Sequence, residues 1–296
     1  MVHLRWKGKP YEAGFKWGQR LYDHGIKLLD QIPFNLDEKR KDFAAACHPF
    51  YQQYNPSVVE EIRGIADGQR IAYEDLTAVL YSMYCIMPDQ KCTCFIMKND
   101  HEYLLCRNSD FLTSLEKLYA NVIYQMEGCY AFQGNTTAFV EIEDGMNDQR
   151  LAIGLTSVYP KTIRPGLNAG MLVRYLLEHC CSTKEALEQL KQLPIASAQV
   201  LTMIDVFGHG AVVECDCESM LVRENGCLTA VNAFTSDALK HKRNTAVDDW
   251  QADVRHDTVV GALRHLPTSS LRTYGKEVLA GKHGFLCQYE LSLIHI

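Results

Sequence analysis

The stretch KCTCFIMKNDHEYLLCRNSDFL, residues 91–112, contains the pattern on which the interpretation of this chain rests. Two apolar runs, CTCFIMK and EYLLCRN, flank the polar turn NDH (99–101), and this arrangement predicts a β-hairpin. The first run opens with two cysteines one residue apart, and the second ends in RNSD (107–110). Because a hairpin brings its two open ends together, we expect the cysteines to lie beside an arginine and an aspartate.

The composition is that of an ordinary globular protein. Of the 296 residues, 47% are apolar and 22% are charged, so the chain can bury a substantial core as one large domain or two smaller ones. The net charge is −6, and no basic stripe interleaved with aromatic residues occurs along the sequence. These features argue against nucleic acid or an anionic membrane as the main partner.

The N-terminal sequence MVHLRWKGKPYEAGFKWG carries charges throughout and lacks the apolar run of a signal peptide. No stretch approaches the roughly 18 consecutive apolar residues that a membrane-spanning helix needs. Twelve cysteines are present, and in a chain without a signal sequence we expect them to be mostly free thiols in a reducing compartment. The sequence therefore predicts a cytoplasmic protein.

The cysteine pairs Cys92/Cys94 and Cys215/Cys217 raise the question of a zinc site. A Cys-x-Cys on an extended strand places both side chains on one face without the turn of the usual Cys-x2-Cys ligand pair, and no His-x3-5-His accompanies either pair. We therefore expect no metal and no cofactor, while a zinc-binding module stays as a less favoured alternative.

Helical patterns dominate the first third of the chain. Apolar residues at helical spacing predict a helix over 14–29, and two further helices are predicted over 56–69 and 73–84. Asn55 has the character of an N-cap for the second of these, and Pro56 occupies its first helical position.

Extended runs dominate from Cys92 onward. A helical pair, 166–180 and a helix that starts at the capping box 182–185, separates two groups of strands, and another helix is predicted at 254–266. This order indicates an α+β fold in which two antiparallel sheets pack together with helices outside. The final residues, ELSLIHI, follow a strand that begins at Phe285, and we expect a truncated C-terminus. The strands expected after the hairpin are 119–126, 129–134, 137–143, 150–159, 199–206, 210–216, 219–225 and 226–231.

A cysteine nucleophile needs a base, and the sequence leaves two kinds open. None of the eleven histidines lies in a context that recommends it; His209, for example, falls in a turn between strands, so a Cys/His pair stays an open alternative. The other base is the α-amine of the cysteine itself. Its pKa is about 8, so it can accept the thiol proton at neutral pH. This amine exists only if the chain is cut before the cysteine.

Several segments, in order along the chain, carry a family resemblance. Residues 58–84 are similar to the helical segment before the family's nucleophile, and Cys92-Thr93 followed by RNSD matches its Cys-Thr…(Arg/Gln)-Asn-x-Asp pattern. The chain thus resembles the N-terminal nucleophile (Ntn) hydrolases of the acyl-CoA:6-aminopenicillanic acid acyltransferase type, relatives of choloylglycine hydrolase and penicillin V acylase. Further similar segments are LAIGLTSVYP (151–160), IDVFGHGAVVE (204–214), LTAVNAFTSDAL (228–239) and ADVRHDTVVGAL (252–263).

The resemblance implies a four-layer αββα sandwich of two antiparallel sheets, the Ntn hydrolase fold, with a helical N-terminal segment. Residues 1–91 would form that segment, cleaved between Lys91 and Cys92 yet still associated, and residues 92–296 would form the core. The implied activity is hydrolysis of linear, non-peptide C–N amide bonds of N-acylated small molecules through an acyl-thioester. Alternatives are an acyltransferase that moves an acyl group from acyl-CoA to an amine, and a non-catalytic binding protein of the same fold.

The resemblance also implies partners and roles for residues. The partner would be a small acyl amide or acyl thioester, with no nucleic acid and no membrane, while a homo-oligomer stays open. Cys92 rather than Cys94 would be the nucleophile, since Arg107 and Asp110 then fall at the usual spacing. Asp110 would hold the amine, and Arg107 would lower the thiol pKa. Asn232 would donate to the oxyanion, a contribution of roughly 3 kcal/mol in comparable sites. Further candidates for the substrate pocket are Thr156, Tyr159 and Arg255.

Each candidate also has a purely structural interpretation. Cys92 could be one more buried cysteine, and Arg107 with Asp110 could be a surface ion pair worth under about 1 kcal/mol. Asn232 could be a turn residue. The remaining candidates could be ordinary sheet residues (Thr156 and Tyr159) or the head of a helix paired with an acid (Arg255).

Two residues depart from the family pattern. Lys91 stands before the nucleophile where glycine is usual, and Ala233 follows the asparagine where histidine is usual. These departures bear on how efficiently the chain is cut and on which substrate it prefers.

Overall fold

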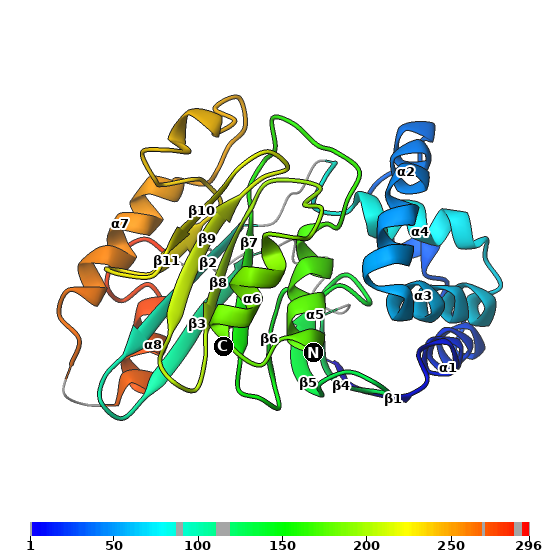
Figure 1. Ribbon diagram of the computed structural model, residues 1–296, viewed down its shortest axis with the longest axis horizontal. Coiled ribbons are helices and arrows are strands. Elements are labelled where there is room, and N and C mark those ends of the chain that lie inside the picture. Colours follow the sequence, from blue (N-terminus) through cyan, green and yellow to red (C-terminus); the bar gives the residue numbers. More distant parts are fainter. Residues whose placement is uncertain (1, 87–90, 111–118, 268–269, 287–291, 296) are drawn as a thin grey trace.

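The computed structural model of the protein describes residues 2–86, 91–110, 119–267, 270–286 and 292–295. Within these residues an eight-stranded and a four-stranded sheet lie face to face, and helices cover the outer side of each sheet (Figure 1). The predicted α+β sandwich of two sheets is confirmed in this arrangement.

The larger sheet is antiparallel except for its first pair of strands, β1 and β4, which run parallel. Its strands, in spatial order, are β1 (Val2–Gly8), β4 (Ala120–Met126), β5 (Phe132–Thr136), β6 (Asp144–Asn147), β7 (Ala152–Ser157), β8 (Gln199–Ile204), β9 (Gly210–Cys215) and β10 (Met220–Arg223).

The smaller sheet contains the hairpin that the sequence predicts. Its strands, in spatial order, are β11 (Thr229–Val231), β2 (Lys91–Lys98), β3 (Tyr103–Asp110) and β12 (Ser292–His295), and all neighbouring pairs are antiparallel. Strand β2 packs on β7 and β8 of the larger sheet, so the start of the hairpin lies between the sheets.

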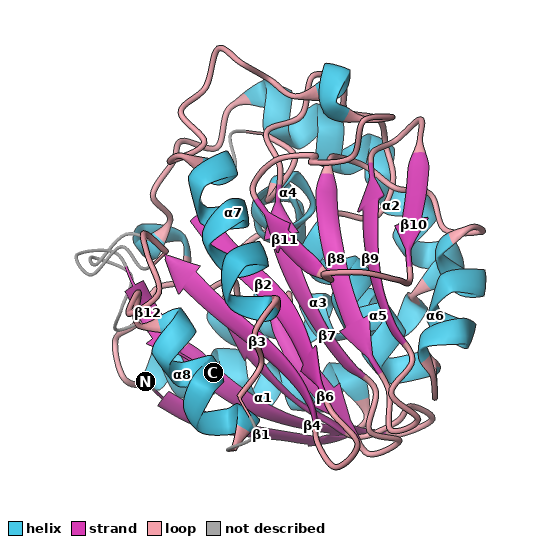
Figure 2. Ribbon diagram, turned by 90° about the vertical axis from the view of Figure 1, so that its left-hand side faces the viewer, coloured by secondary structure: helices cyan, strands magenta, loops and turns pink. Residues whose placement is uncertain are grey.

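Helices complete the layers on both sides. On the outer face of the smaller sheet lie α7 (Ala252–Leu263) and α8 (Leu271–Leu279), which stand in front of that sheet in Figure 2. Helices α5 (Ala169–His179) and α6 (Thr183–Leu190) lie on the other side of the larger sheet. The helical capping predictions hold, because the Ser182 side chain accepts from the Glu185 backbone N–H at the start of α6.

The N-terminal helices extend the outer layer beside α5, at the right of Figure 1. They are α1 (Pro10–Asp23), α2 (Glu38–Tyr54), α3 (Pro56–Gln69) and α4 (Tyr73–Ser82), with a short 3-10 turn at Leu29–Gln31. The predicted limits of α3 are confirmed, and the Asn55 side chain caps it by accepting from the Val58 backbone N–H.

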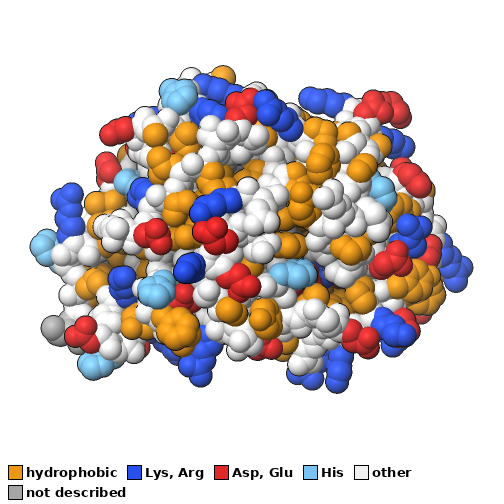
Figure 3. Space-filling view, in the orientation of Figure 1, with side chains coloured by type: hydrophobic (Ala, Val, Ile, Leu, Met, Phe, Trp, Pro, Cys, Tyr) orange, Lys and Arg blue, Asp and Glu red, His pale blue; other side chains and the backbone are white. Residues whose placement is uncertain are grey.

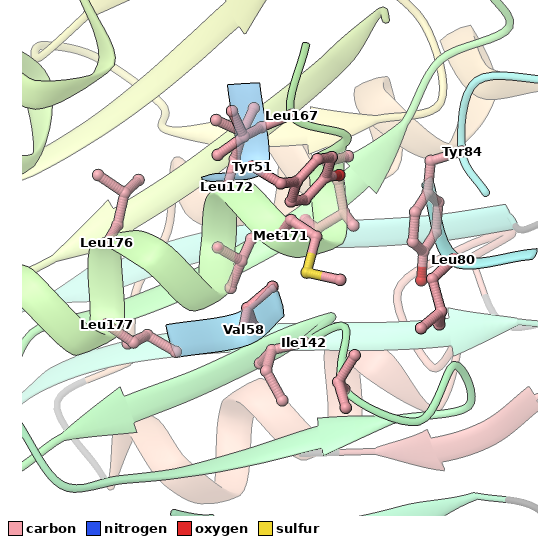
Figure 4. Packing of buried hydrophobic residues seen from close by; sticks show 14 of the residues in the cluster. Tyr51, Val58, Leu80, Tyr84, Ile142, Leu167, Met171, Leu172, Leu176 and Leu177 are labelled. Carbon is pink, nitrogen blue, oxygen red and sulfur yellow. The ribbon is translucent and has the colours of Figure 1, made fainter. Parts of the chain in front are cut away.

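A single apolar core joins these helices to the larger sheet. Figure 4 shows Tyr51 and Val58 from α2 and α3 packed against Met171 and Leu172 of α5, with Ile142 nearby. These side chains are fully buried. The N-terminal region is therefore packed into the same core as the rest of the molecule.

Several features of the fold differ from the sequence-based expectation. Strand β1 lies within the segment expected to be helical, and α2 and α8 were not anticipated. Residues 137–143, predicted as a strand, form a loop instead, with Phe139 in the left-handed region at φ 58°. The alternating apolar residues of that segment are still buried, because the loop folds them into the core; they are Ala138, Val140 and Ile142.

The surface carries charges of both signs. On the face shown in Figure 3, acidic and basic side chains are interspersed with apolar ones, and neither sign covers a continuous area. None of the helices in the described ranges is both long enough and apolar enough to cross a lipid bilayer.

Candidate active site

Strand pairing brings the two ends of the hairpin together as the sequence predicts. In the β2–β3 register Cys92 lies opposite Ser109, Cys94 opposite Arg107 and Lys91 opposite Asp110. Paired residues share a face of the sheet, and successive residues alternate between faces. Cys94 packs in the cluster between the two sheets. The Cys92 side chain, two residues earlier, therefore also faces the larger sheet.

The Cys92 thiol is fully buried and has Arg107 as a partner. The Nη2 of Arg107 donates to the Cys92 Sγ at 3.1 Å. The same guanidinium donates to the Leu155 carbonyl at 2.8 Å and to the Asp144 carboxylate at 2.7 Å. These contacts hold the guanidinium against the sulfur from the side of the larger sheet.

Burial decides the protonation state of this thiol. Removal from water raises the Cys92 pKa to about 11, although the Arg107 charge acts in the opposite direction. The lowering effect expected for Arg107 is thus present but smaller than the effect of burial. At neutral pH the uncut chain holds Cys92 as a protonated thiol, which is a poor nucleophile.

The backbone nitrogen of Cys92 has its own side-chain partner. It donates to Asn232 Oδ1 at 2.6 Å, from the residue that directly follows β11. Asn232 Nδ2 donates to the Ser157 carbonyl at 2.8 Å, and Arg255 Nη2 donates to Asn232 Oδ1 at 3.2 Å. Because a carbonyl only accepts and a guanidinium only donates, these neighbours define which end of the amide is oxygen.

Both ends of the Asn232 amide have partners in this structure. Its oxygen accepts from the Cys92 backbone nitrogen, while its NH2 group donates to the Ser157 carbonyl. The NH2 group carries two hydrogens, so the bond to Ser157 leaves one of them for another acceptor such as an oxyanion. The structure places Asn232 beside Cys92, as the resemblance implies, in an orientation that suits an amine at the Cys92 nitrogen.

Arg255 contacts the backbone of Cys92 directly. Its Nη1 donates to the Cys92 carbonyl at 2.7 Å and to Thr93 Oγ1 at 3.1 Å. The rest of the guanidinium donates to the carbonyls of Asp249 and Trp250. Trp250 and the following Gln251 both have left-handed backbone angles, with φ of 55° and 54°, at the loop that presents these carbonyls. Burial lowers the Arg255 pKa.

Asp110 and Lys91 lie at the entrance of the hairpin. Asp110 is fully buried. Its negative charge raises the pKa of Arg255, whereas burial lowers that pKa. Lys91 is 3% exposed, and its Nζ lies 4.7 Å from the centre of the Tyr159 ring. Asp110 is thus buried opposite the residue before the expected scissile bond, and the half-buried Tyr159 contacts the side chain of that residue.

Thr156 serves the sheet framework. Its hydroxyl is buried and contacts two carbonyls, Val231 at 3.1 Å and Val200 at 3.3 Å. These bonds tie β7 to β11 and β8, which agrees with the structural interpretation of this residue.

Two buried acidic residues behind Arg107 were not anticipated from the sequence. Asp144 pairs with Arg107 at 2.7 Å, and a Glu143 oxygen lies 3.5 Å from the guanidinium. Glu143 also accepts from the Ser109 hydroxyl at 2.8 Å and from Thr137. The signal available in the sequence was an acidic pair at the end of the apolar run TAFVEIE, which we interpreted as a strand end.

Two cavities border the residues around Cys92. A hollow of about 10 Å³, enough for one water-sized group, is bordered by Tyr159, Asn232 and Ala233. A cavity of about 650 Å³ opens between the sheets, and Arg107 and Asp144 form part of its wall. Among the described residues, no group of three or more His, Cys, Asp or Glu side chains is arranged to hold a metal ion.

The model of one protein family, acyl-coenzyme A:6-aminopenicillanic acid acyl-transferase, matches residues 96–271, which is more than half of the chain. The chain belongs to this family. The range of this chain that matches the acyl-transferase family includes Arg107, Asp110, Asn232 and Arg255. Cys92 lies four residues before the start of that range. The family is described by an acyl-transferase, which is an enzyme.

Solved structures similar to this chain were also found. A Caenorhabditis elegans N-acylethanolamine-hydrolyzing acid amidase ortholog is similar with a TM-score of 0.52 and 17% identity, over 68% of this chain and 89% of that one. Penicillin V acylase from Agrobacterium tumefaciens matches with a TM-score of 0.39 and 14% identity, over 69% and 68%. A mutant conjugated bile acid hydrolase from Clostridium perfringens matches with a TM-score of 0.35 and 20% identity, over 50% and 55%.

Proposed function

We propose that this member of the acyl-transferase family is a self-processing cysteine amidase that cleaves linear amide bonds of N-acylated small molecules. The observation that carries the proposal is the pair of partners around Cys92. Its sulfur and its backbone nitrogen each have a buried polar side chain in contact, Arg107 for the first and Asn232 for the second. A dedicated partner for the backbone nitrogen suits a residue whose nitrogen becomes a free amine.

The first proposed step is cleavage of the chain itself. The Cys92 sulfur attacks the carbonyl carbon of Lys91, the bond between that carbon and the Cys92 nitrogen breaks, and the thiol proton goes to that nitrogen. Water then hydrolyses the thioester, which leaves a carboxylate on Lys91 and a thiol and an amine on Cys92. The buried state of Cys92 supports this order, since the uncut chain excludes substrate from the sulfur.

The second proposed step is turnover of an amide. The new amine accepts the thiol proton, the sulfur attacks the substrate carbonyl, and the leaving amine takes that proton as the C–N bond breaks. Asn232 and Asp110 hold the Cys92 amine, while Arg107 stabilises negative charge on the sulfur. Arg255 holds the Cys92 carbonyl and the Asn232 oxygen, so it positions the nucleophile.

The acyl-enzyme can pass its acyl group to water or to an amine. The family description names an acyl-coenzyme A acyl-transferase. The second candidate function is therefore an acyltransferase that takes the acyl group from acyl-CoA and passes it to an amine. The two candidates share the first half-reaction and differ in what attacks the thioester. Adding an amine acceptor to cleaved protein and substrate separates them: a hydrolase forms free acid, whereas a transferase forms a new amide.

Intact-mass spectrometry of the purified protein tests the proposal. We expect the wild type to separate into fragments of residues 1–91 and 92–296, and Cys92→Ala to remain whole. Cys94→Ala is the matched control, because this neighbour faces the same way but contacts neither Arg107 Nη2 nor Asn232 in the described hydrogen bonds; it should still be cut. A wild-type chain that stays whole at every pH tested would contradict self-processing and leave a non-catalytic protein of the same fold.

A further inference from the structure

A row of polar side chains crosses the larger sheet where it faces the hairpin. Strand β4 contributes Asn121, β5 contributes Asn135 and β6 contributes Asp144, and all three are buried. They line the cavity of about 650 Å³ together with Arg107. The inner faces of a two-sheet sandwich normally carry apolar side chains, because a buried polar group without a partner is costly. These three residues, the polar row, are therefore unusual for their position.

Hydrogen bonds join the polar row and end at Arg107. In the strand registers Asn121 lies opposite Asn135, and Asn135 lies opposite Asp144. Asn121 Nδ2 donates to Asn135 Oδ1 at 2.8 Å, and Asn135 Nδ2 donates to Asp144 Oδ1 at 2.6 Å. The other oxygen of Asp144 accepts from Arg107 Nη1 at 2.7 Å. Each carboxylate oxygen thus has a donor on a different strand, and the two donors together fix the orientation of Asp144.

The neighbouring carboxylate, Glu143, has other partners. Its Oε2 accepts from the Ser109 hydroxyl at 2.8 Å and lies 3.5 Å from the Arg107 guanidinium, while its Oε1 accepts from the Thr137 hydroxyl at 2.6 Å. A hydrogen bond of 3.5 Å is weak, whereas one of 2.7 Å between a guanidinium and a carboxylate is strong. Asp144 is therefore the carboxylate that orients Arg107, and Glu143 acts on it mainly through its charge.

The geometry of the guanidinium links Asp144 to the nucleophile. Nη2 of Arg107 faces the Cys92 sulfur at 3.1 Å, and Nε donates to the Leu155 carbonyl. The planar guanidinium holds its donors in a fixed fork, so the partners of Nη1 and Nε decide where Nη2 points. Asp144 makes no described hydrogen bond to Cys92, so its effect on the sulfur passes through Arg107.

We infer that Asp144, held by Asn135, is a positioning residue of the proposed reaction and keeps Arg107 Nη2 directed at the Cys92 sulfur. This inference rests on the proposed function. It adds to the site a hydrogen-bonded row on strands β4, β5 and β6 that the sequence pattern around Cys92 does not contain.

The two adjacent carboxylates give variants with opposite expected effects. The readout is alkylation of Cys92 by iodoacetamide in the cleaved protein, followed across a series of pH values by mass spectrometry of the first peptide of fragment 92–296. The rate follows the thiolate fraction, so the midpoint of the profile gives the thiol pKa. Asp144→Asn should move the midpoint up by about one pH unit, or about tenfold in rate at neutral pH, because Arg107 no longer faces the sulfur. Glu143→Gln should move it down, because the charge of Glu143 raises the Cys92 pKa.

The direction of the change separates positioning from simple electrostatics. Loss of a negative charge near a thiol lowers the thiol pKa when nothing else changes. An unchanged or lower midpoint in Asp144→Asn would therefore overturn the inference. Arg107, Asp110 and Arg255 also act on the sulfur, and both variants keep them, together with the amine and the carboxylate that cleavage creates.

An exchange of two residues tests the polar row itself. In Asp144→Asn the new amide has one oxygen for two donors, Arg107 Nη1 and Asn135 Nδ2. Adding Asn135→Asp lets that oxygen accept from Arg107 while the NH2 group donates to the new carboxylate. We expect the double variant to regain the wild-type midpoint. A midpoint that stays at the value of Asp144→Asn would overturn the inference.

Asn135→Ala decides the matter if Asp144→Asn does not fold or is not cut. This substitution changes no charge and shortens a side chain at the wall of a cavity. The midpoint should rise, by less than in Asp144→Asn, and an unmoved midpoint would contradict the inference. The proposed function fails by a different result, in the wild type alone: a chain that stays whole, or fragments in which Cys92 is not alkylated at any pH.

Discussion

Arg107 is a fully buried guanidinium that lies between the Cys92 thiol and two acidic side chains, Asp144 and Glu143. Its charge compensates those carboxylates and at the same time faces the sulfur. Burial raises the Asp144 pKa, and Arg107 opposes that rise. A single residue thus connects the stability of the core with the chemistry of the thiol.

Removing this charge should destabilise the protein strongly. Arg107→Met leaves two buried carboxylates without their cation, and we expect the free energy of unfolding to fall by about 3–5 kcal/mol. The measurement is urea unfolding in the Cys92→Ala background, where the chain stays intact. Arg164→Met is the control, since Arg164 is 57% exposed in its pair with Glu218 and should change stability by less than about 1 kcal/mol. Similar losses for the two variants would contradict this account of Arg107.

Sequence reasoning at the residue scale succeeded where the relevant residues are near one another along the chain. Cys92 and Arg107 are 15 residues apart, and the hairpin between them is a local structure. Glu143 and Asp144 reach Arg107 from 36 and 37 residues away, across the space between the sheets. Their contact depends on how the sheets pack, and for that reason it was missed.

At the scale of elements, helices α1 and α3 cross at very short distance. Each has two glycines four residues apart where they meet, Gly14 and Gly18 on α1 and Gly64 and Gly68 on α3. A Cβ at Gly64 would lie 2.1 Å from the Tyr11 carbonyl oxygen, which is backbone and has no room to move aside. The absence of side chains here determines the spacing of the two helices.

Gly64→Ala should therefore separate α1 from α3. We expect a loss of about 1–3 kcal/mol of unfolding free energy, typical of overpacking, in urea unfolding of the intact Cys92→Ala chain. Gly261→Ala is the matched control in α7, where an added Cβ meets nothing within 4 Å. There the helix should gain about 0.5–1 kcal/mol, because alanine is the better helix former. A stabilising Gly64→Ala would show that the crossing is wider than described.

At the scale of the whole molecule, the N-terminal region is built into the rest of the protein. Strand β1 forms a parallel ladder with β4 along its full length. Arg174 of α5 is fully buried, pairs with Glu61 of α3 and with Glu178, and donates to the Val140 carbonyl at 3.1 Å. After a cut at Lys91, the β1–β4 ladder and the Arg174–Glu61 pair would cross between the two fragments.

The fragments should consequently remain together after cleavage. We expect residues 1–91 and 92–296 to elute as one species in size-exclusion chromatography and to separate only in denaturant, with uncut Cys92→Ala eluting at the same volume. Arg174→Met should lower the urea concentration at which the fragments separate, because it leaves buried carboxylates unpaired. Elution of fragment 1–91 by itself in plain buffer would contradict this.

The sequence by itself determined the features that depend on neighbouring residues. These include the N-caps at Asn55 and Ser182, the limits of α3, the β2–β3 hairpin and the pattern that points to Cys92. Each is set by backbone propensity and by side chains within a few residues or one turn of chain, and such preferences can be recognised without knowledge of the rest of the fold.

Only the tertiary structure decided what surrounds Cys92. Its nitrogen meets Asn232 from 140 residues away and its carbonyl meets Arg255 from 163 residues away, so both contacts exist only once β11 and α7 have packed beside β2. Burial in the assembled core raises the Cys92 pKa to about 11, and the packing of the two sheets places Lys91 against Tyr159. Desolvation is a property of the assembled core, and no residue type or spacing along the chain specifies it.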